Sequence, residues 1–250
     1  MISRTRFIAL LLGCGLSLSA AAQTLTVSAA ASLQNALREV GTTYQAAHPG
    51  AKIDFNFGAS GALLAQIAKG APADVFASAD LATMDRAQAR NLIAASSRTN
   101  FVANQLVVIS PRSAPAHLKA AADLQRDAVR RIAVGAPASV PAGRYAQEAL
   151  ERDGLWAGLV PKLVFAENVR QALNYVSRAE VDAALVYSTD AKIDAATVRI
   201  DFALPTVQPL LYPVARVAAS PNVKEADAFI AYLKSEPAQA AFERFGFKRP

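Results

Sequence analysis

Strand-like and helix-like segments alternate along most of this chain, and this alternation constrains the fold more than any other feature. Short apolar runs bounded by turn residues are typical of strands, and apolar residues spaced three and four apart are typical of helices. The alternation predicts an α/β fold with two open sheets rather than one. Strands are predicted at residues 25–30, 53–57, 75–78, 105–110, 131–135, 162–166, 183–187, 198–204 and 210–217.

Helices are predicted in the intervals between these strands. Hydroxyl or carboxylate side chains stand where three of the helices would begin, as helix starts favour. The predicted helices begin at Ser32, at Ser60 and after Asp80, and continue with 141–152, 168–177, 223–235 and 237–245. The chain is expected to cross between the two sheets near Asn104 and again within 205–213. Residues 23–104 with 206–250 would then form one lobe, and residues 105–205 the other.

The first 22 residues have the composition of a secretory signal peptide. Arg4 and Arg6 precede an apolar run at 7–18, and small residues at 20–22 stand just before Gln23. The run is too short for a permanent membrane span, so cleavage after Ala22 and export to the periplasm are predicted. The alternative is a buried N-terminal helix.

The only cysteine, Cys14, lies inside this segment. The letters LLGC at 11–14 loosely resemble a lipoprotein cleavage box, so a lipid anchor at Cys14 is a minor alternative. The apolar core before Cys14 would be very short for that purpose. If the signal is removed, the mature chain contains no disulfide and no cysteine ligand for a metal.

The charge of the chain is basic but dispersed. The formal charge is +6, and loss of Arg4 and Arg6 with the signal leaves +4. Basic residues do not form a run with interleaved aromatic residues, so nucleic-acid binding is not expected. The charge is interpreted as a solvated surface that can attract anions at long range.

Two serines follow neighbouring predicted strands at the points where helices begin. Ser32 stands in AAASL at 29–33, and Ser60 stands in GASGAL at 58–63. Ligands of open α/β sheets bind beyond the carboxyl ends of strands, where free backbone N–H groups of helix termini favour anions. The plain alternative is that each serine caps its own helix, which contributes about 1 kcal/mol. Two such junctions together favour a shared anion site.

Three further candidates come from the second half of the chain. VPAG at 140–143 places proline in a first helical turn and leaves the amide of Ala142 unobstructed. ENVR at 167–170 enters the next helix at Val169, and Tyr187 ends an apolar strand as a phenol donor. The alternatives are ordinary helix starts and a core tyrosine.

Other chemistries have weaker support. His48 and His117 have no partners at metal-ligand spacing, so no metal-cation site is predicted. GASGA at 58–62 is one glycine short of a nucleophile elbow, so a secreted serine hydrolase using Ser60 stays as an alternative without a persuasive base. No phosphate-binding loop or dinucleotide fingerprint is present. The chain is therefore predicted not to be an enzyme and to have no catalytic residues.

These segments resemble the periplasmic molybdate-binding protein family, the substrate-binding component of molybdate ABC transporters. The resemblance covers nearly all of the mature chain, and the combination of motifs is specific where each alone is weak. The matching segments are 29–33, 57–61, GAPADVFASAD at 70–80, 135–146, 167–170, Val186-Tyr187, YLK at 232–234 and FGF at 245–247.

The resemblance implies a type II periplasmic binding protein, with two α/β lobes joined by a two-segment hinge and the anion in the cleft. It implies hydroxyl and amide contacts from Ser32 and Ser60, amide contacts from Ala142 and Val169, and a phenol contact from Tyr187. Asp74 and Asp80 are interpreted as structural. Many relatives carry a serine where Ala59 stands, so one auxiliary hydrogen bond is expected to be missing.

The resemblance also implies the ligand and the partner. A monomer would bind molybdate or tungstate without any cofactor and deliver it to an inner-membrane ABC transporter permease. The expected shell contains only donors, so a protonated oxyanion such as phosphate would leave an O–H unpaired at a cost of about 1–3 kcal/mol. Sulfate would have to be rejected by size, and Arg170 is expected to point away and pair with a carboxylate. Sulfate, phosphate or a small organic anion remains the alternative ligand.

Overall fold

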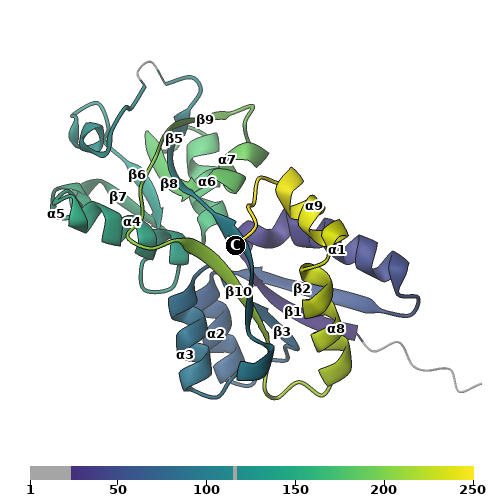
Figure 1. The fold of residues 1–250 in the computed structure, drawn as a ribbon. Helices are drawn as coiled ribbons and strands as arrows, with labels where there is room; N and C mark the ends of the chain where they lie inside the picture. The colour runs from purple at the N-terminus through teal and green to yellow at the C-terminus, as the bar shows by residue number, and fades with distance from the viewer. Residues whose placement is uncertain (1–23, 115–116) are drawn as a thin grey trace, which may run out of the picture.

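Two five-stranded mixed sheets with helices packed on them form the protein (Figure 1). The computed structural model describes residues 24–114 and 117–250, so the predicted signal peptide and Cys14 lie outside the described residues. Within the described ranges, no helix is long and apolar enough to cross a membrane. The predicted α/β class with two open sheets is confirmed.

The first sheet has the strand order β2-β1-β3-β10-β4. Strands β1, β2 and β3 are parallel, while β10 is antiparallel to both of its neighbours. We call this sheet and its helices lobe I. Its strands are β1 (Thr24–Ala30), β2 (Lys52–Gly58), β3 (Val75–Ala77), β4 (Thr99–Asn104) and β10 (Leu210–Arg216).

The second sheet repeats this pattern with the order β7-β6-β8-β5-β9. Strands β6, β7 and β8 are parallel, while β5 is antiparallel to β8 and β9. We call this sheet and its helices lobe II. Its strands are β5 (Leu106–Pro111), β6 (Ile132–Gly135), β7 (Leu163–Ala166), β8 (Ala183–Tyr187) and β9 (Val198–Ala203).

Helices cover both faces of the first sheet. Val75 and Ala77 of β3 belong to one hydrophobic cluster, while Phe76 between them belongs to another on the opposite face. A strand buried on both faces is apolar throughout instead of alternating, which explains the run of three buried residues in β3. The helices of lobe I are α1 (Gln34–Ala47), α2 (Ser60–Ala68), α3 (Leu81–Ala89), α8 (Val223–Leu233) and α9 (Glu236–Arg244), with 3₁₀ turns at Ala31–Leu33 and Ala95–Ser97.

Helices also cover the sheet of lobe II. Helices α4 and α6 pack on the buried strands β6 and β8, and α7 packs on β5 and β9. Its helices are α4 (Pro141–Arg152), α5 (Trp156–Leu159), α6 (Val169–Ser177) and α7 (Ser188–Ile193), with 3₁₀ turns at Ala121–Gln125 and Val160–Lys162. The sequence predicted the bounds of α4 as they are found, but it predicted neither α5 nor α7.

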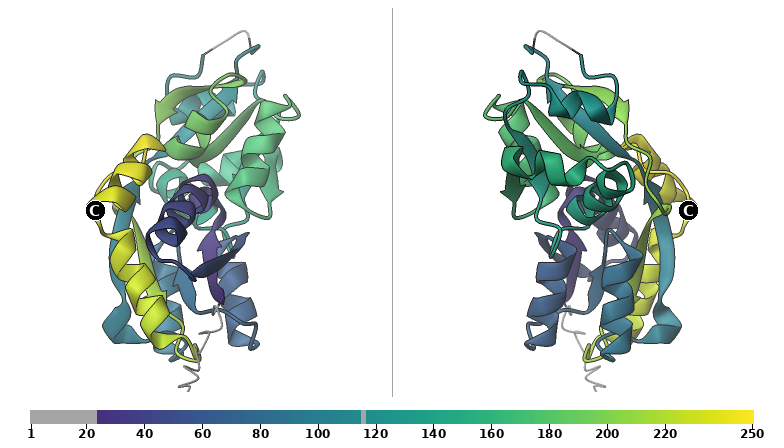
Figure 2. Two further views of the ribbon diagram at one scale, coloured as in Figure 1. Left: turned by 90° about the vertical axis from the view of Figure 1, so that its right-hand side faces the viewer. Right: turned by 90° about the vertical axis from the view of Figure 1, so that its left-hand side faces the viewer.

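The chain passes between the sheets twice. It leaves lobe I between β4 and β5 and returns between β9 and β10, and the two connections run side by side (Figure 1). The boundaries expected at 104/105 and 205/206 fall in these connections. Strand β4 was not predicted, although it is the edge strand that leads into the first connection. Figure 2 shows α8 and α9, in yellow, along one side of the molecule, so the C-terminus returns to lobe I.

Candidate functional site

The carboxyl ends of six parallel strands, three from each lobe, meet at one cavity. Its lining residues come directly after β1, β2 and β3 of lobe I and after β6, β7 and the end of β8 in lobe II. The empty space is about 200 Å³, so it suits a small ligand. The lining residues are Ala30, Ala31, Ser32, Gly58, Ala59, Ser60, Ala79, Val140, Pro141, Ala142, Asn168, Val169 and Tyr187.

All five residues predicted to contact the ligand line this cavity. Ser32 and Ser60 come from lobe I, and Ala142, Val169 and Tyr187 come from lobe II. The structure therefore brings the five together across the cleft, from segments that are far apart in the sequence. Their role as ligand contacts stays a prediction.

Ser32 is not a helix cap, in contrast to the simplest interpretation of the sequence. It is the central residue of the 3₁₀ turn before α1, and the N-cap position is Ala30. Its Oγ lies 3.1 Å from the hydroxyl oxygen of Tyr212, a buried residue of β10. The Asn104 side chain donates to the same tyrosine oxygen at 3.2 Å. Tyr212 therefore orients the Ser32 hydroxyl, and Asn104, at the end of β4, holds Tyr212 in turn.

Ser60 is not a helix cap either. It is the first residue of α2, with Ala59 at the N-cap and no side-chain cap bond. Its Oγ accepts a hydrogen bond from the backbone N–H of Ala79 at 3.0 Å. Since a hydroxyl that accepts this bond keeps its own proton, Ser60 can still donate to a second partner in the cavity.

The Tyr187 hydroxyl is buried and makes no hydrogen bond of ordinary geometry to another described residue, although the Tyr212 ring packs edge-on against the Tyr187 ring with 5.7 Å between centroids. The side chain is 1% exposed and reaches the cavity from the end of β8. Burial raises the pKa of Tyr187 well above its usual value, with the nearby Tyr212 acting in the same direction, so the phenol stays protonated. Buried polar groups rarely lack a partner, so each exception needs an explanation, and a ligand in the cavity would supply one for Tyr187.

Two helix N-termini complete the lining on the side of lobe II. In α4, Pro141 takes the first helical position and Ala142 the second, with no side-chain cap. In α6, the Asn168 side chain caps the amide of Gln171 at 3.0 Å and leaves the amide of Val169 uncapped. The first amides of a helix have no partner within the helix, so both N–H groups are available to an anion.

No lysine or arginine lines the cavity. The prediction that Arg170 pairs with a carboxylate is confirmed, because its Nε donates to Asp190 Oδ1 at 2.5 Å. Burial raises the pKa of Asp190, although Arg170 opposes this effect. Asp80 caps α3 through the amide of Thr83, as predicted, and also pairs with Arg144 of lobe II, which the sequence did not predict.

Sequence reasoning missed Ala79 and the polar residues behind the cavity. Ala79 follows β3 at the same sheet edge as Ser32 and Ser60, so the strand-end argument could have found it. Tyr212 could not have been found in this way, because it lies 180 residues from Ser32 in the sequence. Asn104 ends the unpredicted strand β4 and bonds Tyr212 rather than Ser32.

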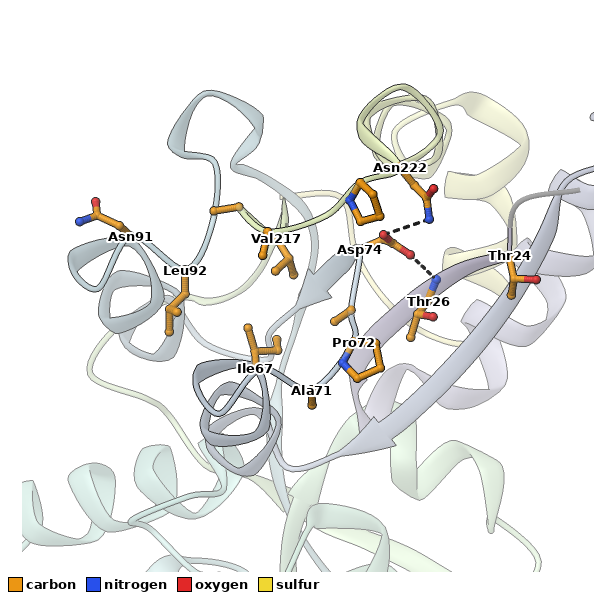
Figure 3. A pocket seen from close by; sticks show the side chains of 15 residues that line it. Thr24, Thr26, Ile67, Ala71, Pro72, Asp74, Asn91, Leu92, Val217 and Asn222 are labelled. Carbon is orange, nitrogen blue, oxygen red and sulfur yellow. Dashed lines mark hydrogen bonds between the residues drawn. The ribbon is translucent and has the colours of Figure 1, made fainter. Parts of the chain in front are cut away.

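A second, larger hollow lies at the far end of lobe I (Figure 3), with an empty space of about 970 Å³. Asp74 lies in its wall and accepts hydrogen bonds from the Thr26 amide and from the side chains of Ser220 and Asn222. Its carboxylate thus ties β1 to the segment after β10, which agrees with its predicted structural role. A buried carboxylate of this kind disfavours an anion, so size alone does not identify the ligand site.

The two histidines contact residues outside the cavity. The His48 ring stacks on Tyr44 with 4.1 Å between ring centroids, and His117 Nδ1 lies 3.5 Å from Asp201 Oδ1. Neither histidine lines the cavity that contains Ser60. Among the described residues, no cluster of three or more His, Cys, Asp or Glu could hold a metal ion.

Curated relatives match nearly the whole chain. A molybdate-binding protein ModA of Haemophilus influenzae is 37% identical over 243 residues, which cover 95% of this chain and 94% of that protein. A putative ABC transporter substrate-binding lipoprotein, YvgL, of Bacillus subtilis is 37% identical over 90% of this chain and 86% of its own length.

Solved structures agree with this similarity. The substrate-binding domain of a putative molybdenum ABC transporter from Clostridium difficile is 37% identical, with a TM-score of 0.69, and the match covers 91% of this chain and 99% of that one. The periplasmic molybdate-binding protein of Azotobacter vinelandii is 23% identical with a TM-score of 0.80 over 90% and 99% of the two chains, and this shows the shared two-lobed fold alone. The family model of bacterial extracellular solute-binding proteins matches residues 25–248, and the chain belongs to this family.

Proposed function

We propose that this protein binds molybdate or tungstate between its lobes and delivers the anion to an ABC transporter permease. The observation that carries the proposal is the unpartnered hydroxyl of Tyr187, buried in a cavity that is otherwise lined by two serine hydroxyls, uncapped backbone amides and the Asn168 side chain, whose oxygen is already bonded to the Gln171 amide. Such donors supply partial positive charge to a dianion, and charge-assisted hydrogen bonds are strong in a dry cleft. Relatives named as molybdate-binding proteins support this choice of anion.

The donor set also explains selection among oxyanions. Phosphate near neutral pH carries a proton that needs an acceptor, and an unpaired O–H in the cavity would cost about 1–3 kcal/mol. Sulfate is fully deprotonated but has shorter bonds, so a cavity shaped for metal–oxygen distances would hold it loosely. Sulfate is the second candidate, because a sulfate-binding protein of Mycobacterium tuberculosis shares the fold with a TM-score of 0.78 at 17% identity.

Hinge closure is the proposed mode of action. The anion would bridge donors of both lobes and stabilise the closed form, which the transporter would recognise. The protein would act as a monomer and would need no cofactor and no metal cation. It would bind no nucleic acid, since its charge is dispersed.

Calorimetric titration of the ligand-stripped protein tests the proposal. Molybdate and tungstate should bind tightly, while sulfate and phosphate should bind at least about a hundredfold more weakly, or roughly 2.7 kcal/mol. Ser32→Ala and Ser60→Ala should each weaken molybdate binding at least about tenfold, or roughly 1.4 kcal/mol. Ser177→Ala is the matched control, because that hydroxyl bonds Asp194 away from the cavity. Preferred binding of sulfate, or wild-type affinity in both site variants, would contradict the assignment.

Export to the periplasm is part of the proposal. The family is extracellular by description, and the first strand begins at Thr24, just beyond the predicted cleavage after Ala22. Mass spectrometry of the protein from its native host should find Gln23 at the N-terminus. A diacylglycerol-modified Cys14 would instead indicate a lipoprotein, as the name of the Bacillus subtilis relative suggests for that protein.

A further inference from the structure

We propose that Arg170 is a positioning residue that joins three of the anion-binding residues across the cleft and so stabilises the closed form. This inference rests on the proposed function, because it concerns the same cavity. Arg170 does not line the cavity itself. It acts through its neighbours in both lobes.

The first link is to lobe I. Arg170 is the residue after Val169 in α6 of lobe II. Its Nη2 donates to the backbone oxygen of Ser32 at 3.3 Å, and its Nη1 donates to the side-chain oxygen of Asn35 at 2.8 Å. Ser32 lies in the 3₁₀ turn after β1 and Asn35 lies in the first turn of α1, so the guanidinium holds this segment beside the N-terminus of α6. These bonds can form only when the two lobes are close together.

The second link stays within lobe II. Asp190 is completely buried, and its Oδ1 accepts from Arg170 Nε at 2.5 Å. Its Oδ2 accepts from the backbone N–H of Tyr187 at 3.3 Å. The pair therefore connects Arg170 to the residue that carries the unpartnered hydroxyl. Arg170 is thus linked to three residues that line the cavity. It follows Val169 in the chain, it bonds Ser32 directly, and it reaches Tyr187 through the Asp190 carboxylate.

The pair also adjusts the electrostatics of the cavity. A carboxylate at Asp190 without a partner would repel a dianion in the cavity, and Arg170 compensates this charge. Each of the three guanidinium nitrogens has an acceptor in the protein, and Arg170 does not line the cavity, so it supports the site without contacting the ligand. Because Arg170 neutralises Asp190, the donors that line the cavity can bind an anion although a carboxylate is buried behind them.

The geometry requires arginine in particular. Three different nitrogen atoms of one guanidinium serve Asp190, Asn35 and Ser32. The planar fork fixes these directions together, whereas a lysine ammonium is a single point charge. Arg170→Lys can keep the pair with Asp190 but cannot hold both contacts to lobe I. Removal of the charge would leave Asp190 unpaired and endanger folding, so the lysine variant is the informative one.

Asn35→Ala and Arg170→Lys, alone and combined, test the proposal. Neither variant should shift the unfolding temperature of the ligand-free protein by more than about 2 °C, because the lost bonds form only on closure. Molybdate binding should weaken about fivefold in Asn35→Ala, which loses one charge-assisted hydrogen bond, and about tenfold in Arg170→Lys, which loses both contacts to lobe I. The loss should appear as faster dissociation in stopped-flow displacement, since the closed form is destabilised.

The double variant separates positioning from general weakening. If Arg170 acts through Asn35, Asn35→Ala should cost less than about twofold in the Arg170→Lys background, because residues in contact are not additive. Arg216→Lys is the matched control, since Arg216 pairs with Asp227 in lobe I at 3.0 Å and is not among the residues that line the cavity. It should bind molybdate like the wild type.

The outcomes distinguish this inference from the proposed function. Wild-type dissociation rates in both single variants, or additive losses in the double variant, would overturn the role of Arg170 while leaving molybdate binding intact. If the wild-type protein itself binds no molybdate, the proposed function fails and the positioning role fails with it.

Discussion

At the scale of residues, the site depends on which hydrogen-bond partner each polar group has in the protein. Ser60 accepts from Ala79 and keeps a proton to donate, while Ser32 is held by Tyr212. Tyr187 alone has a buried hydroxyl at the cavity with no partner among the described residues. An unmade bond costs free energy in the ligand-free protein, and the ligand can recover that cost by accepting the bond. The Tyr187 hydroxyl adds no hydrogen bond of ordinary geometry to the described part of the fold, and this is why we propose it as a donor to the ligand.

Tyr187→Phe separates these two effects. The variant removes a hydroxyl that makes no protein bond, so the free energy of unfolding of the ligand-free protein should stay equal or rise by about 1 kcal/mol. Molybdate affinity should fall about tenfold or more, because a donor to the dianion is lost. Chemical denaturation without ligand and calorimetry with molybdate measure the two quantities.

Tyr212→Phe is the contrasting variant, since that hydroxyl is bonded to Ser32 and Asn104. It should lower the free energy of unfolding by about 1 kcal/mol as well as weaken binding. Loss of stability without loss of affinity in Tyr187→Phe would show that the phenol is an ordinary core group and not a donor to the anion.

At the scale of elements, the sequence predicts features that depend on local interactions and misses features that depend on long-range interactions. Parallel strands and long helices were found because apolar periodicity is a local property, and α4 was predicted with its observed bounds. Strand β4 has only Phe101 and Val102 buried, and three of the four half-buried residues that flank them are polar, so its pattern is weak. Helix α7 is six residues long and contains both Asp190 and Lys192, so it has no apolar periodicity to detect.

The candidate site shows the same division. Strand ends and helix starts can be located in a sequence, which is why all five predicted contacts lie at one cavity. The direction of each serine hydroxyl could not be predicted, because its partner comes from elsewhere in the fold. Local reasoning allowed a cap on the serine's own helix, whereas Ser32 bonds across 180 residues and Ser60 across 19. The partners of Arg170 in lobe I are equally remote in sequence.

At the scale of the whole molecule, two sheets of equal topology place matching strand ends face to face. Closure therefore depends on how nearly the backbones of the two lobes can approach. The two backbones come into direct contact at Gly61 in α2, whose N–H donates to the backbone oxygen of Ser139 in lobe II at 2.9 Å. A Cβ at this position would lie 2.7 Å from that oxygen and 2.9 Å from the Cα of Ser139. Backbone atoms cannot turn aside as a side chain can, so only glycine permits this contact.

Gly61→Ala should consequently separate folding from closure. Alanine favours a helix over glycine by about 1 kcal/mol, so the ligand-free protein should unfold at an equal or higher temperature. Molybdate affinity should fall more than about tenfold, because the lobes are held apart and the bond to Ser139 is lost. Small-angle X-ray scattering should show a decrease in radius of gyration with molybdate for the wild type and a smaller decrease for the variant.

Gly158→Ala in α5 is the matched control, since its Cβ would meet only the tip of the Gln125 side chain, at 3.1 Å. Wild-type compaction and affinity in Gly61→Ala would mean that the anion is bound without this approach of the lobes, and hinge closure at the cavity would have to be abandoned.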